Sequence, residues 1–399
     1  MELPSSDDIY SLKVDDFDTA KLLTNAARQR DERGLKDVFI VDADSHHYET
    51  ESVAELLEYI EDPVMKQLSR SALGVARKSR GFPYSRVGYQ DVGGRITREP
   101  LRQMEQTVPD GNHRDVQLAL KRMDTMGIDV SVLLPTPMML MGMHPQAEFE
   151  AQVALAYNRW LVEKVLSGSH RLKSFAYLPF NDPEMAYRIV QEFKDVPGII
   201  GFLVTSVRTN AIHENVYAKT YAAIQEAGKV LSFHTGYDWD DPTFGSPSRF
   251  VAVQAIGYPF YNVVHCVNWL CNAMNERFPD LKVLWMEGGL AWVLWVIQRI
   301  DSEYRMRSSE VPGLRKLPSE YMRDMYYTSQ PLEAGDSHLL KMTMKAIDAG
   351  NQVLYASNYP LPDMDVPSVI WDLDFLDEQQ KRNILGENAR KLFKLYEML

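Results

Sequence analysis

The order of apolar and helical segments along the chain is the feature that most restricts its fold. Beyond residue 113, short apolar segments typical of buried strands alternate with longer segments typical of helices. With the apolar run at 39–41 counted first, eight strands are predicted, at 39–41, 129–136, 171–180, 199–206, 229–236, 281–289, 325–331 and 352–360. The helix after the fifth strand is predicted over 261–279. This alternation predicts an α/β protein with the (β/α)8 fold, a TIM barrel. An open doubly wound sheet is the alternative, but six strands would suffice there, and no GxGxxG motif follows the first strand.

Two segments do not follow this rhythm. Residues 1–37 are polar and charge-rich, and we interpret them as an N-terminal arm. Residues 60–112 lack clear periodicity and are rich in glycine and aromatic residues near 81–95, which indicates an insertion that covers the barrel mouth as a lid. The barrel itself is predicted over 38–395. Because such extensions often cover a neighbouring subunit, we expect a homo-oligomer or a hetero-oligomer with a paralogous subunit.

The charge and cysteine content exclude several classes of protein. The 399 residues include 43 basic and 55 acidic side chains, and the net charge of −12 disfavours a nucleic-acid partner. No apolar run approaches the roughly 18 residues of a membrane span, and the acidic N-terminal sequence does not resemble a signal peptide. Cys266 and Cys271 would lie on different faces of a helix, so a disulfide between them is not expected. We therefore expect a cytoplasmic protein that acts on a small molecule.

Side chains that can bind metals follow several of the predicted strands. Asp44, His46 and Glu49 follow the first strand, His234 follows the fifth, and Glu287 follows the sixth. In a parallel barrel the carboxyl ends of all strands meet at one mouth, so we expect these residues to lie together. Alternation along the first strand places Asp44 and His46 on the same side. Imidazole and carboxylate ligands suit Zn²⁺, Fe²⁺ or Mn²⁺, whereas Ca²⁺ takes mostly oxygen ligands. The pattern predicts a divalent-metal site.

Each of these residues also has a structural interpretation. A single Asp-x-His pattern is weak, and His234 could be a buried core histidine. A carboxylate at the buried position of Glu287 is costly unless it is paired or bound to a cation, which favours a functional role. His265, on the helix after the fifth strand, is either a ligand or a packing residue. Arg86 and Arg95 in the inserted segment could bind a substrate carboxylate, although exposed arginines are commonly just solvated.

Four stretches of the sequence resemble the amidohydrolase-related family. They are VDADSHHYE, SFHTG, NERFPDLKVLWMEGGLAWVLWVIQRID and YASNYPLPDMDVPSVI. This family contains metal-dependent hydrolases and nonoxidative decarboxylases of the aminocarboxymuconate-semialdehyde decarboxylase type, and the resemblance extends over residues 38–395. It implies a metal-binding barrel in which Asp44 and His46 are the first-strand ligands and His234 is the fifth-strand ligand.

The sequence departs from the pattern of this family at two strand ends. The family usually carries Ser-Asp-Tyr-Pro-His on the eighth strand, with the aspartate as ligand and proton acceptor. Here Asn358 occupies the aspartate position, and an amide cannot accept a proton from metal-bound water. The usual sixth-strand histidine is replaced by Glu287. Glu287 and Asn358 are therefore the candidate catalytic residues.

Three functions are compatible with this altered site. The favoured one is a nonheme dinuclear monooxygenase that hydroxylates a small organic acid, as in a small branch of the superfamily, with iron or with iron and manganese. It would need an external electron donor, and its two ions would be held by Asp44, His46, Glu49, His234, Glu287 and His265. The second is a hydrolase or nonoxidative decarboxylase with one ion, zinc among the candidates, in which Glu287 is the acid/base. The third is a degenerate subunit that supports a related active barrel.

Overall fold

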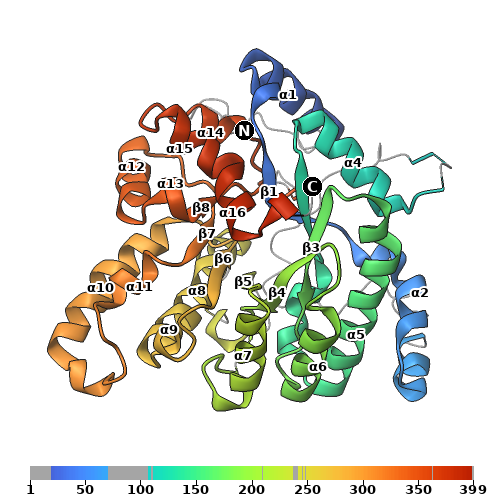
Figure 1. Cartoon of the computed structure of the whole chain (residues 1–399), viewed down its shortest axis with the longest axis horizontal. Coiled ribbons are helices and arrows are strands. Elements are labelled where there is room, and N and C mark those ends of the chain that lie inside the picture. Colours follow the sequence, from blue (N-terminus) through green and yellow to red (C-terminus); the bar gives the residue numbers. More distant parts are fainter. Residues whose placement is uncertain are drawn as a thin grey trace.

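The computed structural model describes residues 19–70, 107–108, 111–208, 210–236, 241–244, 246–247, 249–361 and 363–397. Parallel strands follow one another in sequence order around a barrel, and helices cover its outside (Figure 1). The strands are β1 (Val41–His46), β2 (Val130–Leu134), β3 (Leu172–Tyr177), β4 (Ile199–Thr205), β5 (Val230–His234), β6 (Lys282–Met286), β7 (Tyr326–Thr328) and β8 (Val353–Leu354). The predicted (β/α)8 barrel is confirmed.

The helices follow the local signals of the sequence, with one exception. They are α1 (Thr19–Glu32), α2 (Val53–Leu56), α4 (Arg114–Met126), α5 (Ala147–Trp160), α6 (Pro183–Phe193), α7 (Ala218–Glu226), α8 (Phe250–Cys271), α9 (Met274–Arg277), α10 (Ala291–Arg307), α11 (Pro318–Met322), α12 (Ser337–Ala346), α13 (Ala349–Gln352), α14 (Ser368–Trp371), α15 (Glu378–Arg382) and α16 (Asn388–Leu392). The side chain of Asp182 caps α6 by accepting a hydrogen bond from Met185 N at 3.0 Å. The exception is the helix predicted over 261–279. In the structure α8 begins earlier, at Phe250, because it continues through Pro259, and it ends at Cys271, before the separate α9.

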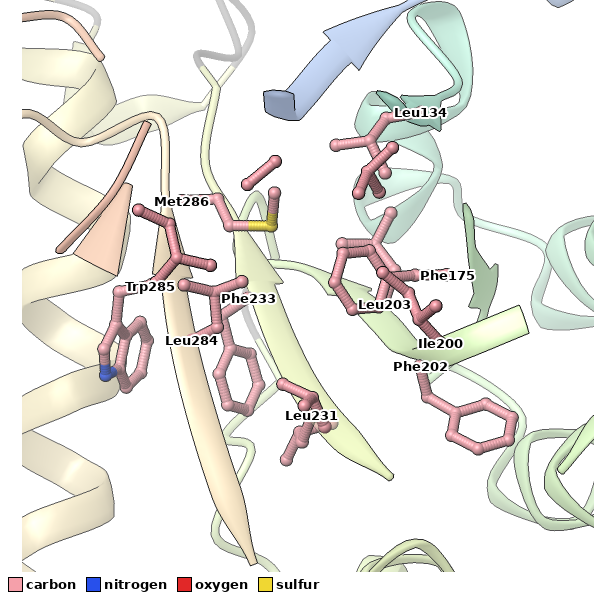
Figure 2. Close-up of a cluster of buried hydrophobic side chains, with 14 of the residues drawn as sticks. Leu134, Phe175, Ile200, Phe202, Leu203, Leu231, Phe233, Leu284, Trp285 and Met286 are labelled. Carbon is pink, nitrogen blue, oxygen red and sulfur yellow. The ribbon is translucent and has the colours of Figure 1, made fainter. Parts of the chain in front are cut away.

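Side chains along the strands alternate between the barrel interior and the helix layer. In β5, the ring of Phe233 lies on the helix side, 4.7 Å from the ring of Trp285 and 5.8 Å from that of Trp269 in α8. Figure 2 shows Phe233 and Trp285 beside each other, with Met286 on the opposite side of its strand. His234 pairs in register with Met286 and therefore faces the interior. The aromatic packing on the outside thus directs His234 inward.

The barrel closes between β1 and β8 through individual hydrogen bonds. Among the described residues, the backbone N–H of Ala43 donates to Tyr355 O at 2.9 Å, and that of Asn358 donates to Asp44 O at 2.9 Å. Elsewhere neighbouring strands form ladders, and β4 pairs with β5 over five consecutive residue pairs. We call the junction of residues 41–47 with residues 355–360 the seam.

The described part of the N-terminal arm packs against the barrel. It forms α1, which lies beside α4 (Figure 1). A guanidinium N–H of Arg30 donates to Asp124 O at 2.7 Å, and Arg33 forms an ion pair with Asp372 at 2.6 Å. Most of the inserted segment is outside the described residues, so its role as a lid stays a prediction. In the part of the chain that the structure describes, no helix is both long and apolar enough to cross a bilayer.

Candidate metal centre

Three of the predicted ligands meet at the barrel mouth. Asp44 and His46 come from β1 and His234 ends β5, and one ligand atom from each lies within 4.8 Å of the others. All three side chains are buried, and the rings of His46 and His234 meet edge to face with centroids 5.2 Å apart. His46 Nε2 lies 3.2 Å from Asp44 Oδ1, and His234 Nε2 lies 3.4 Å from Asp44 Oδ2. The three side chains therefore converge on one point.

The second ring nitrogen of each histidine is held by the backbone. His46 Nδ1 lies 3.0 Å from Pro135 O, and His234 Nδ1 lies 2.7 Å from Thr235 O. A carbonyl can only accept a hydrogen bond, so each Nδ1 carries a proton, and in the neutral ring Nε2 keeps the lone pair that can bind a cation. Both Nε2 atoms and both Asp44 carboxylate oxygens are buried without hydrogen-bond partners. A cation placed among these atoms would satisfy all four.

The electrostatics of Asp44 keep it ionised. Burial raises the pKa of the Asp44 carboxyl, but in the absence of a cation its attraction to the protonated rings of His234 and His46 outweighs burial and holds this pKa below its usual range. The site therefore offers one carboxylate and two imidazole nitrogens.

Glu287 and Asn358 lie together at the edge of this cluster. Asn358 Nδ2 donates to Glu287 Oε1 at 2.9 Å, and Glu287 Oε2 lies 3.5 Å from His234 Nδ1. Both residues adopt left-handed backbone conformations, with φ of 57° at Glu287 and 53° at Asn358. This conformation costs about 1–2 kcal/mol at a residue such as Glu287, whereas asparagine tolerates it better. The Glu287 N–H donates to Thr328 Oγ1 at 2.9 Å. Burial raises the pKa of Glu287 well above its usual value, so the pair places a protonatable carboxyl beside the predicted ligands.

Glu49 and His265 make other contacts. The carboxylate of Glu49 accepts hydrogen bonds from Thr136 N at 2.9 Å and from Met138 N at 2.7 Å, in the loop after β2. His265 Nε2 lies 2.9 Å from Ser206 O, and burial lowers the pKa of His265 to about 4. The structure does not bring these two side chains into the Asp44 cluster, and their role as ligands stays a prediction.

Sequence reasoning missed a buried polar network beneath the cluster. Asp42, Arg122 and Ser357 are all buried and hydrogen-bonded to one another. Two signals could have pointed to it, since Asp42 precedes Asp44 by two residues and Ser357 directly precedes Asn358. Arg122 carries no comparable signal because it lies within an ordinary amphipathic helix. The predicted substrate-binding residues, Arg86 and Arg95, lie outside the described residues.

Comparison with known proteins identifies similar sequences. The amidohydrolase family model matches residues 109–395. The γ-resorcylate decarboxylase of Polaromonas sp. strain JS666 is 21% identical over 260 residues, which cover 61% of this chain and 77% of that protein. The γ-resorcylate decarboxylase of Rhodococcus jostii strain RHA1 is 20% identical over 299 residues, which cover 70% of this chain and 88% of that protein.

Solved structures share the barrel. The dihydroxybenzoic acid decarboxylase of Polaromonas sp. JS666, with bound manganese and the inhibitor 2-nitroresorcinol, has a TM-score of 0.64 at 17% identity, covering 91% of this chain and 99% of that one. The 5-carboxyvanillate decarboxylase of Novosphingobium aromaticivorans, complexed with manganese and 4-hydroxy-3-methoxy-5-nitrobenzoic acid, has a TM-score of 0.65 at 18% identity, covering 91% and 97%. At these identities the likeness shows the fold.

These comparisons correct the favoured function. The dinuclear monooxygenase expected from the sequence is wrong, because the matched proteins are decarboxylases, which are lyases and not oxidoreductases. The external electron donor was predicted only for the monooxygenase reaction, so that prediction has no remaining support. The preference for iron is not supported, since the solved structures described above hold manganese. The resemblance to amidohydrolases is confirmed, and the nonoxidative decarboxylase that the sequence left as an alternative agrees better.

Proposed function

The chain belongs to the amidohydrolase family, and we propose that it is a metal-dependent nonoxidative decarboxylase of a hydroxylated aromatic acid. One observation carries the proposal. Asp44, His46 and His234 converge at the mouth of the barrel with ligand atoms that are buried and lack hydrogen-bond partners. The names of the matched relatives, which are decarboxylases of resorcylate and carboxyvanillate, supply the substrate class.

The donor set fits one divalent cation. Two imidazole nitrogens and a carboxylate suit manganese as well as zinc and iron. Asn358 Oδ1 is also buried without a partner and offers a neutral oxygen ligand. When bound there, the ion would supply Lewis acidity that orients and polarises oxygen atoms of the substrate. We propose Asp44, His46 and His234 as its ligands, with Asn358 as a fourth.

Glu287 is the residue that we assign to proton transfer. During decarboxylation the bond between the ring carbon and the carboxylate carbon breaks, carbon dioxide leaves, and the ring carbon takes a proton in its place. Burial favours the neutral, protonated form of the Glu287 carboxyl. Asn358 Nδ2 donates to Glu287 Oε1, so we assign this proton to Oε2, which lies 3.5 Å from His234 Nδ1. Asn358, which stands at the family's usual aspartate position, thus orients the Glu287 carboxyl that would transfer the proton in place of that aspartate.

Carbon dioxide release from 2,6-dihydroxybenzoate, the substrate named for one solved relative, tests the proposal. Protein stripped by a chelator and reloaded with Mn²⁺ should release carbon dioxide and the decarboxylated phenol in equal amounts. A second reaction should use 5-carboxyvanillate, the substrate named for another solved relative, to compare two patterns of ring substituents. Stripped protein and His234→Ala serve as inactive controls. Oxygen consumption coupled to turnover, or ester hydrolysis without carbon dioxide release, would contradict the proposal.

We also propose that the inserted segment covers the site and that the chain is an oligomer. Residues 47–113 connect the C-terminal end of β1 to the start of α4, so the insertion begins and ends on the mouth side. Alanine at Arg86 or Arg95 should raise KM if either arginine binds the substrate carboxylate. Light scattering should give a mass above the 45.8 kDa of one chain, and a clean monomer would contradict oligomerisation.

A further inference from the structure

A buried ion pair lies below the metal-ligand cluster. Arg122 Nη1 of α4 lies 2.6 Å from Asp42 Oδ2 of β1, and the two side chains are 2% and 0% exposed. The desolvation of two buried charges offsets most of their attraction, so such pairs contribute little net stability compared with apolar packing. They are, however, directional, and they fix the positions of the groups that they contact. The contacts of this pair therefore indicate what it positions.

The guanidinium of Arg122 joins three parts of the barrel. Its Nη1 contacts Ser357 Oγ at 3.3 Å as well as Asp42, and its Nη2 donates to Ser45 Oγ at 3.2 Å and to Ser131 Oγ. These acceptors belong to β1, to β2 and to the segment after β8. One planar group thus connects the two sides of the seam.

Asp42 accepts hydrogen bonds from the backbone next to the proposed metal ligands. Its Oδ1 accepts hydrogen bonds from Ser357 N at 2.9 Å and from Asp44 N at 3.4 Å, and its Oδ2 accepts one from Ser357 Oγ at 2.6 Å. Ser357 Oγ in turn accepts from Tyr359 N at 3.1 Å. The peptide groups of Asp44 and of both neighbours of Asn358 are therefore tied to the same carboxylate and hydroxyl.

The backbone at this point lacks the support of a regular ladder. The register of β1 against β2 shifts between Asp42 and Ser45, so Asp44 lies in an irregular stretch. Across the seam, Asn358 N donates to Asp44 O at 2.9 Å and His46 N donates to Tyr359 O at 2.7 Å. Together with the bond from Ala43 N to Tyr355 O, these are individual hydrogen bonds that do not form a regular ladder.

We propose that Asp42, Arg122 and Ser357 form a positioning unit that holds Asp44 and His46 on β1 in register with Asn358 across the seam. Arginine suits this role because its planar fork reaches several acceptors at once, whereas lysine would keep the charge but could not contact all four. The importance of the unit for catalysis rests on the proposed function, but its effect on the seam does not.

Hydrogen exchange on the metal-free, full-length chain tests the positioning unit. In Arg122→Lys and in Ser357→Ala, amides in peptides spanning 41–47 and 355–360 should exchange about tenfold faster than in the parent, while peptides of β4 and β5 stay unchanged. Ser174→Ala is the matched control for serine, because Ser174 Oγ is buried in β3 and donates to Leu133 O at 2.6 Å. Arg208→Lys is the control for arginine, since Arg208 forms a buried pair with Glu150 at 3.5 Å. Both controls should leave the seam peptides unchanged.

Manganese binding provides a second readout. Both variants at the seam should bind Mn²⁺ about 10–100-fold more weakly than the parent and give an altered Mn²⁺ electron paramagnetic resonance spectrum, while unfolding cooperatively. If Arg122→Lys fails to fold, Ser357→Ala decides the question, because it keeps the ion pair and removes only one hydroxyl. Seam amides that exchange at parental rates, or exchange that accelerates throughout the barrel, would overturn the proposal. A loosened seam in a protein whose parent releases no carbon dioxide would contradict the proposed function alone.

Discussion

The predicted metal ligands come from two regions of the barrel that are built differently. On one side, β5 pairs with β4 and with β6 over five residue pairs each, and His234 lies at the end of both ladders. On the other side, β1 changes register between Asp42 and Ser45 and meets the chain after β8 through single hydrogen bonds. His234 is therefore placed by backbone pairing, and Asp44 is placed by neighbouring side chains.

This difference determines how each region responds to mutation. The β5 region is backed by the apolar contacts of Phe233 with Trp269 and Trp285, and a substitution at His234, which faces the opposite side of the strand, leaves these contacts in place. The seam depends on hydrogen bonds to the charged groups Asp42 and Arg122, each worth about 1.5–3 kcal/mol. Loss of Asp42 or of Arg122 leaves the other charge buried and unpaired, and loss of the Ser357 hydroxyl removes a hydrogen bond to each of the two. A substitution in the β5 region should therefore disturb only its immediate contacts, whereas a substitution in the hydrogen-bond network should loosen the whole seam.

The largest effect is expected from removal of a ligand on either side. His234→Ala and Asp44→Ala should each weaken Mn²⁺ binding by more than the roughly 100-fold typical of changes around a ligand, and activity should fall with it. Both variants should stay folded, because the barrel core does not depend on the ion. Metal analysis after dialysis and circular dichroism measure the two properties. Full metal content in His234→Ala would show that the site is misplaced.

A carboxylate introduced at the seam should respond to Mn²⁺, whereas one introduced beside the paired strands β5 and β6, which we call the ladder side, should not. Asn358→Asp replaces the amide that donates to Glu287 with an acceptor, which should lower the free energy of unfolding of the metal-free protein by about 1–3 kcal/mol. Mn²⁺ should restore this loss, because the new carboxylate would bind the cation.

Asn262→Asp is the matched control for that substitution. Asn262 is equally buried, and its Nδ2 donates to Met286 O at 2.9 Å on the ladder side. Its variant should lose similar stability, and Mn²⁺ should not restore it. Urea denaturation with and without Mn²⁺ measures both proteins. Equal recovery of the two variants, or recovery of neither, would contradict the assignment of Asn358 to the metal site.

The regular part of the molecule is also the part that sequence reasoning predicts best. Strand and helix periodicity repeats around the barrel, so the fold and the order of its strands follow from local pattern, and with them the convergence of Asp44, His46 and His234. The strand bounds follow less well, since the first strand, predicted at 39–41, extends over Val41–His46, and the eighth, predicted at 352–360, is only Val353–Leu354. The hydrogen-bond network at the seam is not predicted, because Asp42, Arg122 and Ser357 are far apart in sequence and no periodicity relates them. Glu49 has the spacing of a ligand, but the path of the loop after β2 turns backbone N–H groups toward it.

The reaction could not be predicted from the altered ligand positions. Glu287 and Asn358 differ from the usual family pattern, and this difference was compatible with oxygenase, hydrolase and decarboxylase chemistry alike. The same barrel supports many reactions, because the chemistry depends on where substrate atoms lie relative to a few groups. Ligand composition gives the affinity for a class of metal, but it does not specify which bond breaks.

A moderate effect, on stability alone, is expected at Glu49. In the parent, Thr136 N and Met138 N each donate to a different oxygen of Glu49. Glu49→Gln keeps an oxygen acceptor for one of these two N–H groups and places its own NH2 group against the other N–H group. The unpaired buried N–H should cost about 1–3 kcal/mol in the free energy of unfolding, with Mn²⁺ content unchanged. Chemical denaturation and metal analysis of the same preparation separate the two outcomes. A loss of metal at unchanged stability would instead make Glu49 a ligand.

The smallest effect compares two residues with nearly the same backbone conformation. Lys394 has φ of 54° just after the end of α16, where glycine is preferred, and its side chain is exposed. Lys394→Gly should therefore raise the free energy of unfolding by about 0.5–1 kcal/mol and leave Mn²⁺ binding unchanged. Asn358→Gly relieves less backbone strain at φ of 53°, because asparagine tolerates the left-handed region better than lysine does. It also removes the hydrogen bond to Glu287, so it should bring no gain in stability and should weaken Mn²⁺ binding. Urea denaturation and Mn²⁺ titration of both variants make the comparison. A stabilised Asn358→Gly with parental Mn²⁺ affinity would mean that the left-handed conformation at the seam serves no function.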